Sequence, residues 1–277
     1  MSKKIANPAK LVKWFILWFL AIFQLFPLLQ LLSNSFRSDR EIKTFPLGFP
    51  KDFLPANYSN TWISGGYSKA FVNSIIVGAF TIVLVLALIS LASYALSKLE
   101  FRGKSFYITY FLMAMSIPSF AYLIPTYFMF NHLNLHNSLW GMVLIYSSRN
   151  IPFNLLLLRT FLLGIPRELE ESAKVDGCNE LTAFLRITLP IAKSIILTVA
   201  LLIFLNTWNE FLFANTFLIS DATRTVATKF VKFTAENSED FAKIFTSGVI
   251  SILPIVILFL CMQKQFIEGL TSGSVKG

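Results

Sequence analysis

Long uncharged stretches alternate with short charged ones along this chain. Asp, Glu, Lys and Arg are absent from 14–36, 70–97, 105–148 and 244–263, and the stretch 194–219 holds one charge, Glu210. A helix rises 1.5 Å per residue, so about 20 residues cross the hydrocarbon core of a bilayer. The pattern predicts membrane-spanning helices at about 14–36, 70–97, 194–219 and 244–265.

The uncharged run 105–148 has 44 residues and as one helix would measure about 66 Å, roughly twice the bilayer core. It must therefore fold back on itself. The polar segment 131–138 is the predicted turn, between spans at 105–130 and 138–162. Pro118 and Pro125 are expected to bend the first of these two spans, and Pro27 to kink the first span of the chain.

The composition agrees with an all-α integral membrane protein of about six transmembrane helices. Hydrophobic residues make up 55% of the 277 residues and charged residues 14%, whereas soluble domains carry about 25% charge. Lys3, Lys4, Lys10 and Lys13 precede the first apolar run as in a signal peptide, but the run is long and lacks an obvious cleavage site, so an uncleaved anchor is expected. The two cysteines, Cys178 and Cys261, lie in a loop and in a span, so no disulfide is expected between them.

The net charge of +9 would suggest nucleic acid in a soluble protein, but here the basic residues flank apolar segments. With six spans, 14 of the 24 Lys and Arg fall on the side of the termini and nine on the opposite side, with Arg149 inside the membrane. The excess predicts cytoplasmic termini, namely residues 1–13 and a tail at 267–277. A multi-pass protein of a bacterial plasma membrane is expected, with the lipid bilayer and not nucleic acid as its surroundings.

The charged segment 165–192 has the pattern of two short helices rather than a simple connector. Pro166 followed by Glu168, Glu170 and Glu171 is typical of a helix start. Gly177 can adopt the left-handed conformation that ends a helix. Apolar residues then recur at helical spacing up to Pro190, which is expected to close the second helix. The segment predicts a helix–turn–helix elbow on the cytoplasmic face, shaped to dock in a partner's groove; an ordinary amphipathic interfacial helix is the alternative.

The residues of this elbow resemble a known motif. Glu171-Ser172-Ala173, three residues, Gly177, nine residues and Ile187-Thr188-Leu189-Pro190 match the spacing of the EAA loop of ATP-binding-cassette (ABC) importer permeases, with Ser172 in place of the middle alanine. Trp208-Asn209-Glu210-Phe211 resembles a signature of carbohydrate-importer permeases. The final residues 266–277 look like the tail of their MalG-type subunits.

This resemblance implies the type I ABC importer permease fold and a sugar, in particular an oligosaccharide, as the transported solute. It implies four kinds of partner: a second, MalF-type permease, two ATPase subunits, an extracytoplasmic solute-binding protein and the sugar. ATP and magnesium would bind the ATPases, so this chain would be a non-catalytic subunit without a cofactor of its own. The resemblance assigns contact with an ATPase to the elbow residues Glu170, Glu171, Ser172, Ala173, Asp176, Gly177, Ile187, Leu189 and Pro190. Glu171 would meet a basic residue there, Ala173 would pack closely and Gly177 would shape the turn.

Two charges are predicted at or near membrane depth, Arg149 and Glu210. Intramembrane charges are costly and face a bundle interior or an aqueous cavity. The asparagines Asn150, Asn154, Asn206 and Asn209 accompany them in the sequence. These groups either line the solute path, where sugar hydroxyls need donors and acceptors, or join helices, or sit near a membrane interface. Arg149 and Glu210 could also form a pair.

Other functions fit the residues less well. The only Gly-Lys-Ser, at 103–105, lacks the glycine that a phosphate-binding loop needs five residues earlier, where Lys98 stands. An ion-coupled secondary transporter would leave the elbow unexplained. A membrane enzyme would need a convergent catalytic set, which the spans lack. Among importers, a permease for a different polar solute is the remaining alternative.

Overall fold

The structure is a computed structural model that describes residues 8–272, with side chains described from Lys10 to Gln265 and at Ile267. These residues contain helices and no strands, as the apolar pattern predicts. The helices of span length or near it are α1 (Pro8–Ser35), α4 (Tyr67–Lys98), α5 (Lys104–Ser116), α6 (Ser119–His132), α7 (Leu139–Leu163), α11 (Lys193–Trp208) and α14 (Phe241–Ser272). The shorter ones are α2 (Asp39–Thr44), α3 (Ala56–Ser64), α8 (Glu168–Val175), α9 (Glu180–Ala183), the π-helix Phe184–Thr188, α10 (Leu189–Ile191), α12 (Leu212–Phe217) and α13 (Val226–Glu236).

The chain divides into two compact units. Unit 1 comprises residues up to 66 together with 230–253, and unit 2 comprises 67–229 together with the part of the chain from 254 onward. In unit 1 the buried Arg37 holds the segment after α1. Its guanidinium lies 3.2 Å from the Glu41 carboxylate and donates to the carbonyl of Phe45 at 2.8 Å. The helix α1 itself leaves most of its apolar side chains exposed, as a lipid-facing helix does.

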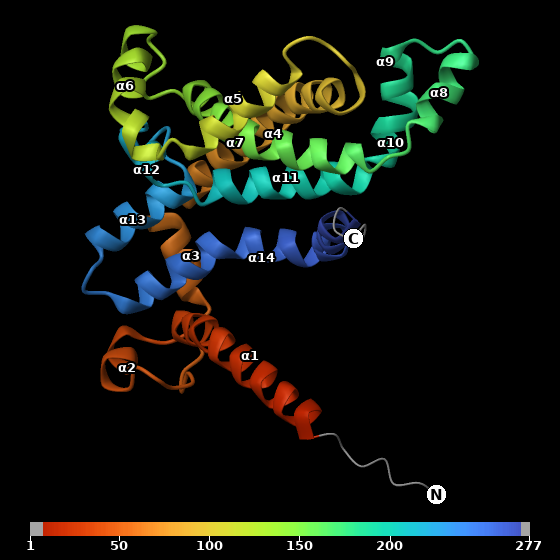
Figure 1. Cartoon of the computed structure of the whole chain (residues 1–277). Coiled ribbons are helices and arrows are strands. Elements are labelled where there is room, and N and C mark those ends of the chain that lie inside the picture. Colours follow the sequence, from red (N-terminus) through yellow and green to blue (C-terminus); the bar gives the residue numbers. More distant parts are fainter. Residues whose placement is uncertain (1–7, 273–277) are drawn as a thin grey trace, which may run out of the picture. The chain divides into compact units, whose positions relative to one another are not determined.

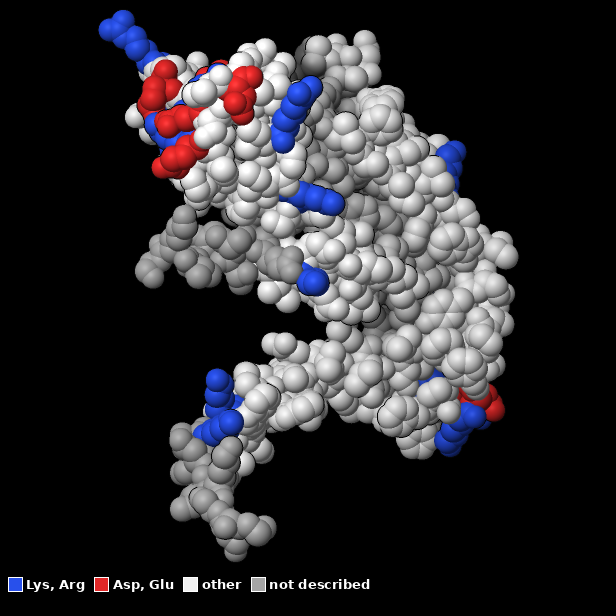
Figure 2. All heavy atoms as spheres, turned by 90° about the vertical axis from the view of Figure 1, so that its right-hand side faces the viewer, with Lys and Arg blue, Asp and Glu red and all other residues white. Residues whose placement is uncertain are grey.

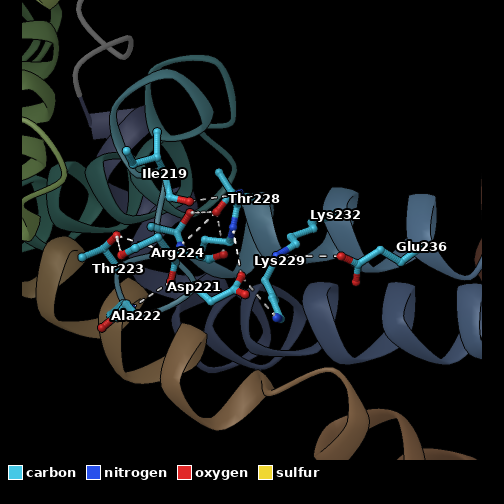
Figure 3. A network of polar contacts seen from close by, with 12 residues as sticks. Ile219, Asp221, Ala222, Thr223, Arg224, Thr228, Lys229, Lys232 and Glu236 are labelled. Atoms are coloured by element: carbon cyan, nitrogen blue, oxygen red, sulfur yellow. Dashed lines mark hydrogen bonds and ion pairs between the residues drawn. The ribbon is translucent and has the colours of Figure 1, made fainter.

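Unit 2 is built on α4, α7 and α11, which pack along one another (Figure 1). Small residues bring the helices together. The Ser93 hydroxyl donates to the Leu155 carbonyl at 2.9 Å, and a Cβ on Gly78 would lie 3.2 Å from the ring of Phe204. The segment 218–229 is fastened to α4, because the Asn73 amide donates to the carbonyls of Ala222 and Arg224 at 3.0 and 2.9 Å. Within that segment Asp221 pairs with Arg224 and Lys229 (Figure 3).

By length and apolarity, three described helical segments qualify as membrane spans, namely Lys10–Ser35, Tyr67–Lys98 and Phe241–Gln265. Two bent helix pairs raise the number to five if each pair is one span. About six spans were predicted, and the difference is α7, which has 25 residues but carries Arg149, Asn150, Asn154 and Arg159 and does not qualify. The predicted turn at 131–138 is confirmed. It separates α6 from α7 and contains two left-handed residues, Asn134 and Asn137.

Two predicted spans differ from the structure in their course. The span at 105–130 is two helices, α5 and α6, bent by 96°. Pro118 lacks an N–H and holds Ile117 in an extended conformation, so the break falls there, whereas α6 continues through Pro125. The span at 194–219 was predicted as one helix, which is wrong. The helix α11 ends at Trp208, and α12 starts afresh at Leu212.

The ends of other elements also shift. The helix α1 begins at Pro8, inside the predicted tail 1–13, and continues through Pro27. The last helix runs to Ser272 rather than to about 265, and residues 273–277 of the predicted tail lie outside the described part of the chain. The second elbow helix, which begins at Glu180 and includes the π-helix, ends at Ile191, one residue after the Pro190 that was predicted to close it, and the chain bends by 77° before Lys193.

Replacing Gly141 by alanine is expected to destabilise unit 2. A Cβ at this position of α7 would lie 2.3 Å from the carbonyl oxygen of Leu135. The neighbouring Asn137 is anchored, because its side-chain oxygen accepts hydrogen bonds from Ser220 and Thr223 at 3.2 and 2.6 Å. Overpacking of this kind costs about 1–3 kcal/mol. Thermal unfolding in detergent should show a lower midpoint than for Gly164→Ala, where the nearest atom is 3.2 Å away; equal midpoints would contradict the close packing.

Candidate functional site

A polar pocket of about 480 Å³ opens in unit 2 between α5, α6, α7 and the break after α11. Four of the predicted path residues line it: Arg149, Asn150, Asn206 and Glu210. The lining also includes Ser119, Tyr122, Tyr146, Ser148 and Phe153, together with apolar residues of α5. The fold thus gathers residues that lie up to 96 positions apart in the sequence around one cavity.

Glu210 is the most heavily bonded group of the pocket. Its carboxylate accepts hydrogen bonds from the backbone N–H groups of Phe213 and Ala214, both at 3.0 Å, and from the Tyr146 hydroxyl at 2.8 Å. The two N–H groups belong to the first turn of α12, which has no acceptor within its own helix for them. Glu210 therefore starts α12 and explains why the predicted continuous span is broken here.

Arg149 forms an ion pair with the same carboxylate. The distance from Nη1 to Oε1 of Glu210 is 3.1 Å, with 26% of the arginine side chain and 10% of the glutamate side chain exposed. The guanidinium also lies 4.5 Å from the centre of the Phe213 ring, a favourable cation–π distance. The pairing considered from the sequence is therefore present, and the pocket carries no net charge from these two residues.

An amide bridge joins the opposite walls of the pocket. Asn206 of α11 donates to the side-chain oxygen of Asn150 at 3.1 Å, and Asn150 donates to the Tyr146 carbonyl one turn earlier at 2.9 Å. Asn209 and Asn154 are not part of the lining. Asn209 bonds to the Leu205 carbonyl, and Asn154 donates to the Asn150 carbonyl one turn away from the pocket.

Sequence reasoning missed Tyr146, Tyr122, Phe153 and Ser119. A signal for Tyr146 was available, because it lies three and four residues before Arg149 and Asn150 and so shares their helix face. Ser119 and Tyr122 belong to α6 and reach the pocket because α5 and α6 are bent by 96°. No local sequence pattern predicts the angle of this bend. The pocket thus offers neutral hydrogen-bonding groups and aromatic rings beside a balanced ion pair, a set suited to an uncharged polyhydroxy ligand.

The elbow has the predicted helix–turn–helix form, from α8 through α9, the π-helix and α10. Gly177 ends α8 with a φ of +85°. Around it the Cys178 N–H donates to the Ala173 carbonyl at 2.9 Å and the Gly177 N–H to the Lys174 carbonyl at 3.0 Å. This Schellman-type ending uses a left-handed residue, and a glycine adopts it without a steric cost.

The two limbs of the elbow are joined through a buried acid. Glu170 is 6% exposed. Its carboxylate accepts the Thr188 hydroxyl at 2.8 Å and lies 3.8 Å from the ammonium of Lys98 at the end of α4. Ala173 is also buried. The structure therefore separates two neighbouring acids of the elbow: Glu170 faces into this chain, whereas Glu171, the acid of the motif, is exposed.

The outer face of the elbow is charged and partly apolar. Ser172, Asp176 and Pro190 are exposed there, while Ile187 and Leu189 are half-buried, and Val175 is 89% exposed. Acidic and basic side chains gather at this end of unit 2, next to a wide surface without charge (Figure 2). Lys174 pairs with Glu180 across the turn, and the hydrogen bond to that carboxylate raises the pKa of Lys174.

The ion pairs behind the elbow extend to the loop after α4. The Glu100 carboxylate accepts Arg167 at 3.0 Å and Lys104 at 3.3 Å, and these hydrogen bonds lower the pKa of Glu100. The pair is solvent-exposed, so its contribution to stability is small. These contacts nonetheless place the start of α8 next to the loop that follows α4.

An all-helical membrane fold with a polar pocket among its helices and a charged elbow fits the class of transport permeases. The chain matches the family model described as binding-protein-dependent transport system inner membrane component over residues 89–271, and it belongs to that family.

Similar proteins include the probable ABC transporter permease protein YurM of Bacillus subtilis, 36% identical over 95% of this chain and 88% of the relative. The arabinooligosaccharides transport system permease protein AraQ of the same organism is 32% identical over 93% of this chain and 92% of the relative. A crystal structure of a bacterial ABC transporter for the import of the acidic polysaccharide alginate shares the fold, with a TM-score of 0.80 at 22% identity, covering 96% of this chain and 99% of that one.

Proposed function

We propose that this chain is the membrane-spanning subunit of an ABC importer and carries a sugar, in particular an oligosaccharide, into the cell. The observation that carries the proposal is the elbow, whose left-handed Gly177 stands at the required position of the EAA-type motif. Membership of the family supports it. Relatives named for diacetylchitobiose, arabinooligosaccharides and galactooligosaccharides favour an oligosaccharide.

In this proposal the polar pocket lines the solute path. Asn206 and Arg149 present donors to sugar hydroxyls, and the exposed ring of Phe153 offers an apolar face to a sugar ring. The pair of Arg149 with Glu210 leaves the path without net charge, which suits a neutral solute. Glu210 acts by positioning Arg149 and the start of α12.

In the proposed complex, other subunits supply the free energy for transport. Two ATPase subunits hydrolyse ATP with magnesium, and the outer face of the elbow, with Glu171 and Ser172, docks on one of them. A second permease completes the path, and an extracytoplasmic binding protein delivers the sugar. The termini and the elbow lie on the cytoplasmic side, in agreement with the excess of Lys and Arg there.

The test is transport by the complete complex reconstituted in vesicles, with a panel of mono- and oligosaccharides. A neutral oligosaccharide should stimulate ATP hydrolysis and accumulate inside. Uphill accumulation by the purified chain alone, or an elbow accessible only from the vesicle side opposite the ATPases, would contradict the proposal.

Replacing Asn206 by alanine should reduce uptake of the transported sugar about fivefold, since a net hydrogen bond contributes about 1 kcal/mol. Asn209→Ala is the matched control, because Asn209 bears the same group but stays outside the pocket. The expected change is in the sugar concentration for half-maximal uptake, with the basal ATPase rate unchanged. If both variants reduced uptake equally, the pocket would not be the path.

A further inference from the structure

An apolar groove of about 630 Å³ runs along unit 2 where the second limb of the elbow meets α4 and α11. Its walls come from Leu86 and Leu91 of α4, Leu185 and Leu189 of the elbow, and Leu197 of α11, and Lys193 is the one charged residue among the described residues that line it. We refer to it as the elbow groove. It is separate from the polar pocket, with which it shares no lining residue.

Lys193 sets this groove apart from an ordinary apolar surface. It is the first residue of α11, directly after the 77° bend that follows the elbow. Its side chain is exposed, and no hydrogen bond or ion pair joins it to the described residues. The ammonium therefore stands unpaired at the junction between the charged elbow and the apolar helix.

The chemistry of the elbow groove fits one kind of occupant. An apolar channel on a membrane helix accepts a hydrocarbon chain, and an unpaired cation at its end accepts a phosphate. Basic groups at the cytoplasmic edge of membrane helices attract anionic lipid headgroups. A helix of another subunit laid in the groove would enclose the unpaired ammonium at a desolvation cost. We infer that an anionic phospholipid occupies the elbow groove, with an acyl chain among the leucines and its phosphate on Lys193.

A lipid in this groove contacts the second limb of the elbow. Leu185 lies in the π-helix and Leu189 at the start of α10, so the acyl chain packs directly on the limb that Thr188 ties to Glu170. In a π-helix each hydrogen bond spans five residues instead of the four of an α-helix. Such turns are rare and occur mostly as single turns within α-helices. The bound lipid supports this limb from outside.

Photolabelling of the complete complex tests the site without depending on transport. The complex is placed in phosphatidylcholine nanodiscs that contain a small share of phosphatidylglycerol with a diazirine in its acyl chain. Labels should concentrate on 86–91 and 184–197. Lys193→Gln should lower this labelling about fivefold, the effect of one basic residue near an anionic membrane surface. Phosphatidylcholine carrying the same diazirine should label more weakly and be unaffected by Lys193→Gln.

Two matched controls separate the effect of the Lys193 charge on labelling from the effect of the shape of the elbow groove. Lys13→Gln removes an equal charge from α1 and should leave labelling of the groove unchanged. Ala87→Trp, which fills the groove, should lower labelling by both lipids, whereas Ala79→Trp on the exposed surface of the same helix should not. Labelling of α1 without labelling of the groove, covalent links from the second permease in its place, or equal labelling by both lipids regardless of Lys193 would overturn the inference.

Discussion

Replacing Glu210 by alanine should abolish transport and lower the stability of unit 2 by about 3 kcal/mol. The change leaves Arg149 partly buried without its counter-ion, which typically costs 3–5 kcal/mol. It also removes the acceptor for two N–H groups at the start of α12 and for the Tyr146 hydroxyl. Uptake by the reconstituted complex and thermal unfolding of the variant measure the two effects.

Milder variants resolve what each contact contributes. Glu210→Gln retains an acceptor oxygen and loses the charge, so it should fall between the wild type and Glu210→Ala. Arg149→Met combined with Glu210→Gln forms a double-mutant cycle, and a coupling energy above about 0.5 kcal/mol is expected for residues in contact. A coupling energy of zero would contradict the ion pair.

Exchange of the two charges is a poor test of this pair, and the structure explains why. An arginine at position 210 has no acceptor for the N–H groups of Phe213 and Ala214, which Glu210 now satisfies. The exchanged variant, Arg149→Glu with Glu210→Arg, should therefore remain inactive although the wild-type residues are paired. Recovery of full uptake by this variant would mean that the helix-starting role assigned to Glu210 is wrong.

The substitution Gly177→Asp is expected to abolish sugar uptake and sugar-stimulated ATP hydrolysis. The backbone of Gly177 is left-handed, which costs most other residues about 1–2 kcal/mol. No described residue places an atom within 4 Å of a Cβ at this position, so the larger effect is expected on the surface that is proposed to dock on the ATPase. The complex should still insert in the membrane, and ATPase activity with and without sugar measures the loss of coupling.

Gly103 provides the matched control for this substitution. It also has a left-handed backbone, with a φ of +88° and no atom of the described residues within 4 Å of a Cβ, but it lies in the loop before α5. Gly103→Asp should therefore bear a similar conformational cost and retain transport. Gly177→Asn, which is similar to Asp in size and in its tolerance of the left-handed region but carries no charge, should retain more activity than Gly177→Asp if the added charge on the outer face of the elbow dominates. Normal uptake by Gly177→Asp would exclude the elbow as the coupling element.

The architecture of the elbow was accessible from local sequence alone. A proline with acids behind it, a glycine at one site and apolar residues at helical spacing specify a helix start, a left-handed ending and a second helix, because each depends on neighbours within a few residues. The orientation of its acids was not accessible. Glu170 is buried because Lys98 and Thr188, 72 and 18 residues away in the chain, supply its partners.

For the membrane-spanning helices too, the local sequence determined some features and the tertiary structure decided others. Long uncharged runs determined by themselves that the chain is helical and membrane-spanning, since unpaired backbone groups are excluded from hydrocarbon. The tertiary structure decided where the helix from Lys193 stops, because no proline or glycine marks Asn209 or Glu210 and the break is held by the carboxylate of Glu210. It also decided that Arg149 pairs with this carboxylate across 61 residues, since such a contact depends on helix packing and not on local pattern.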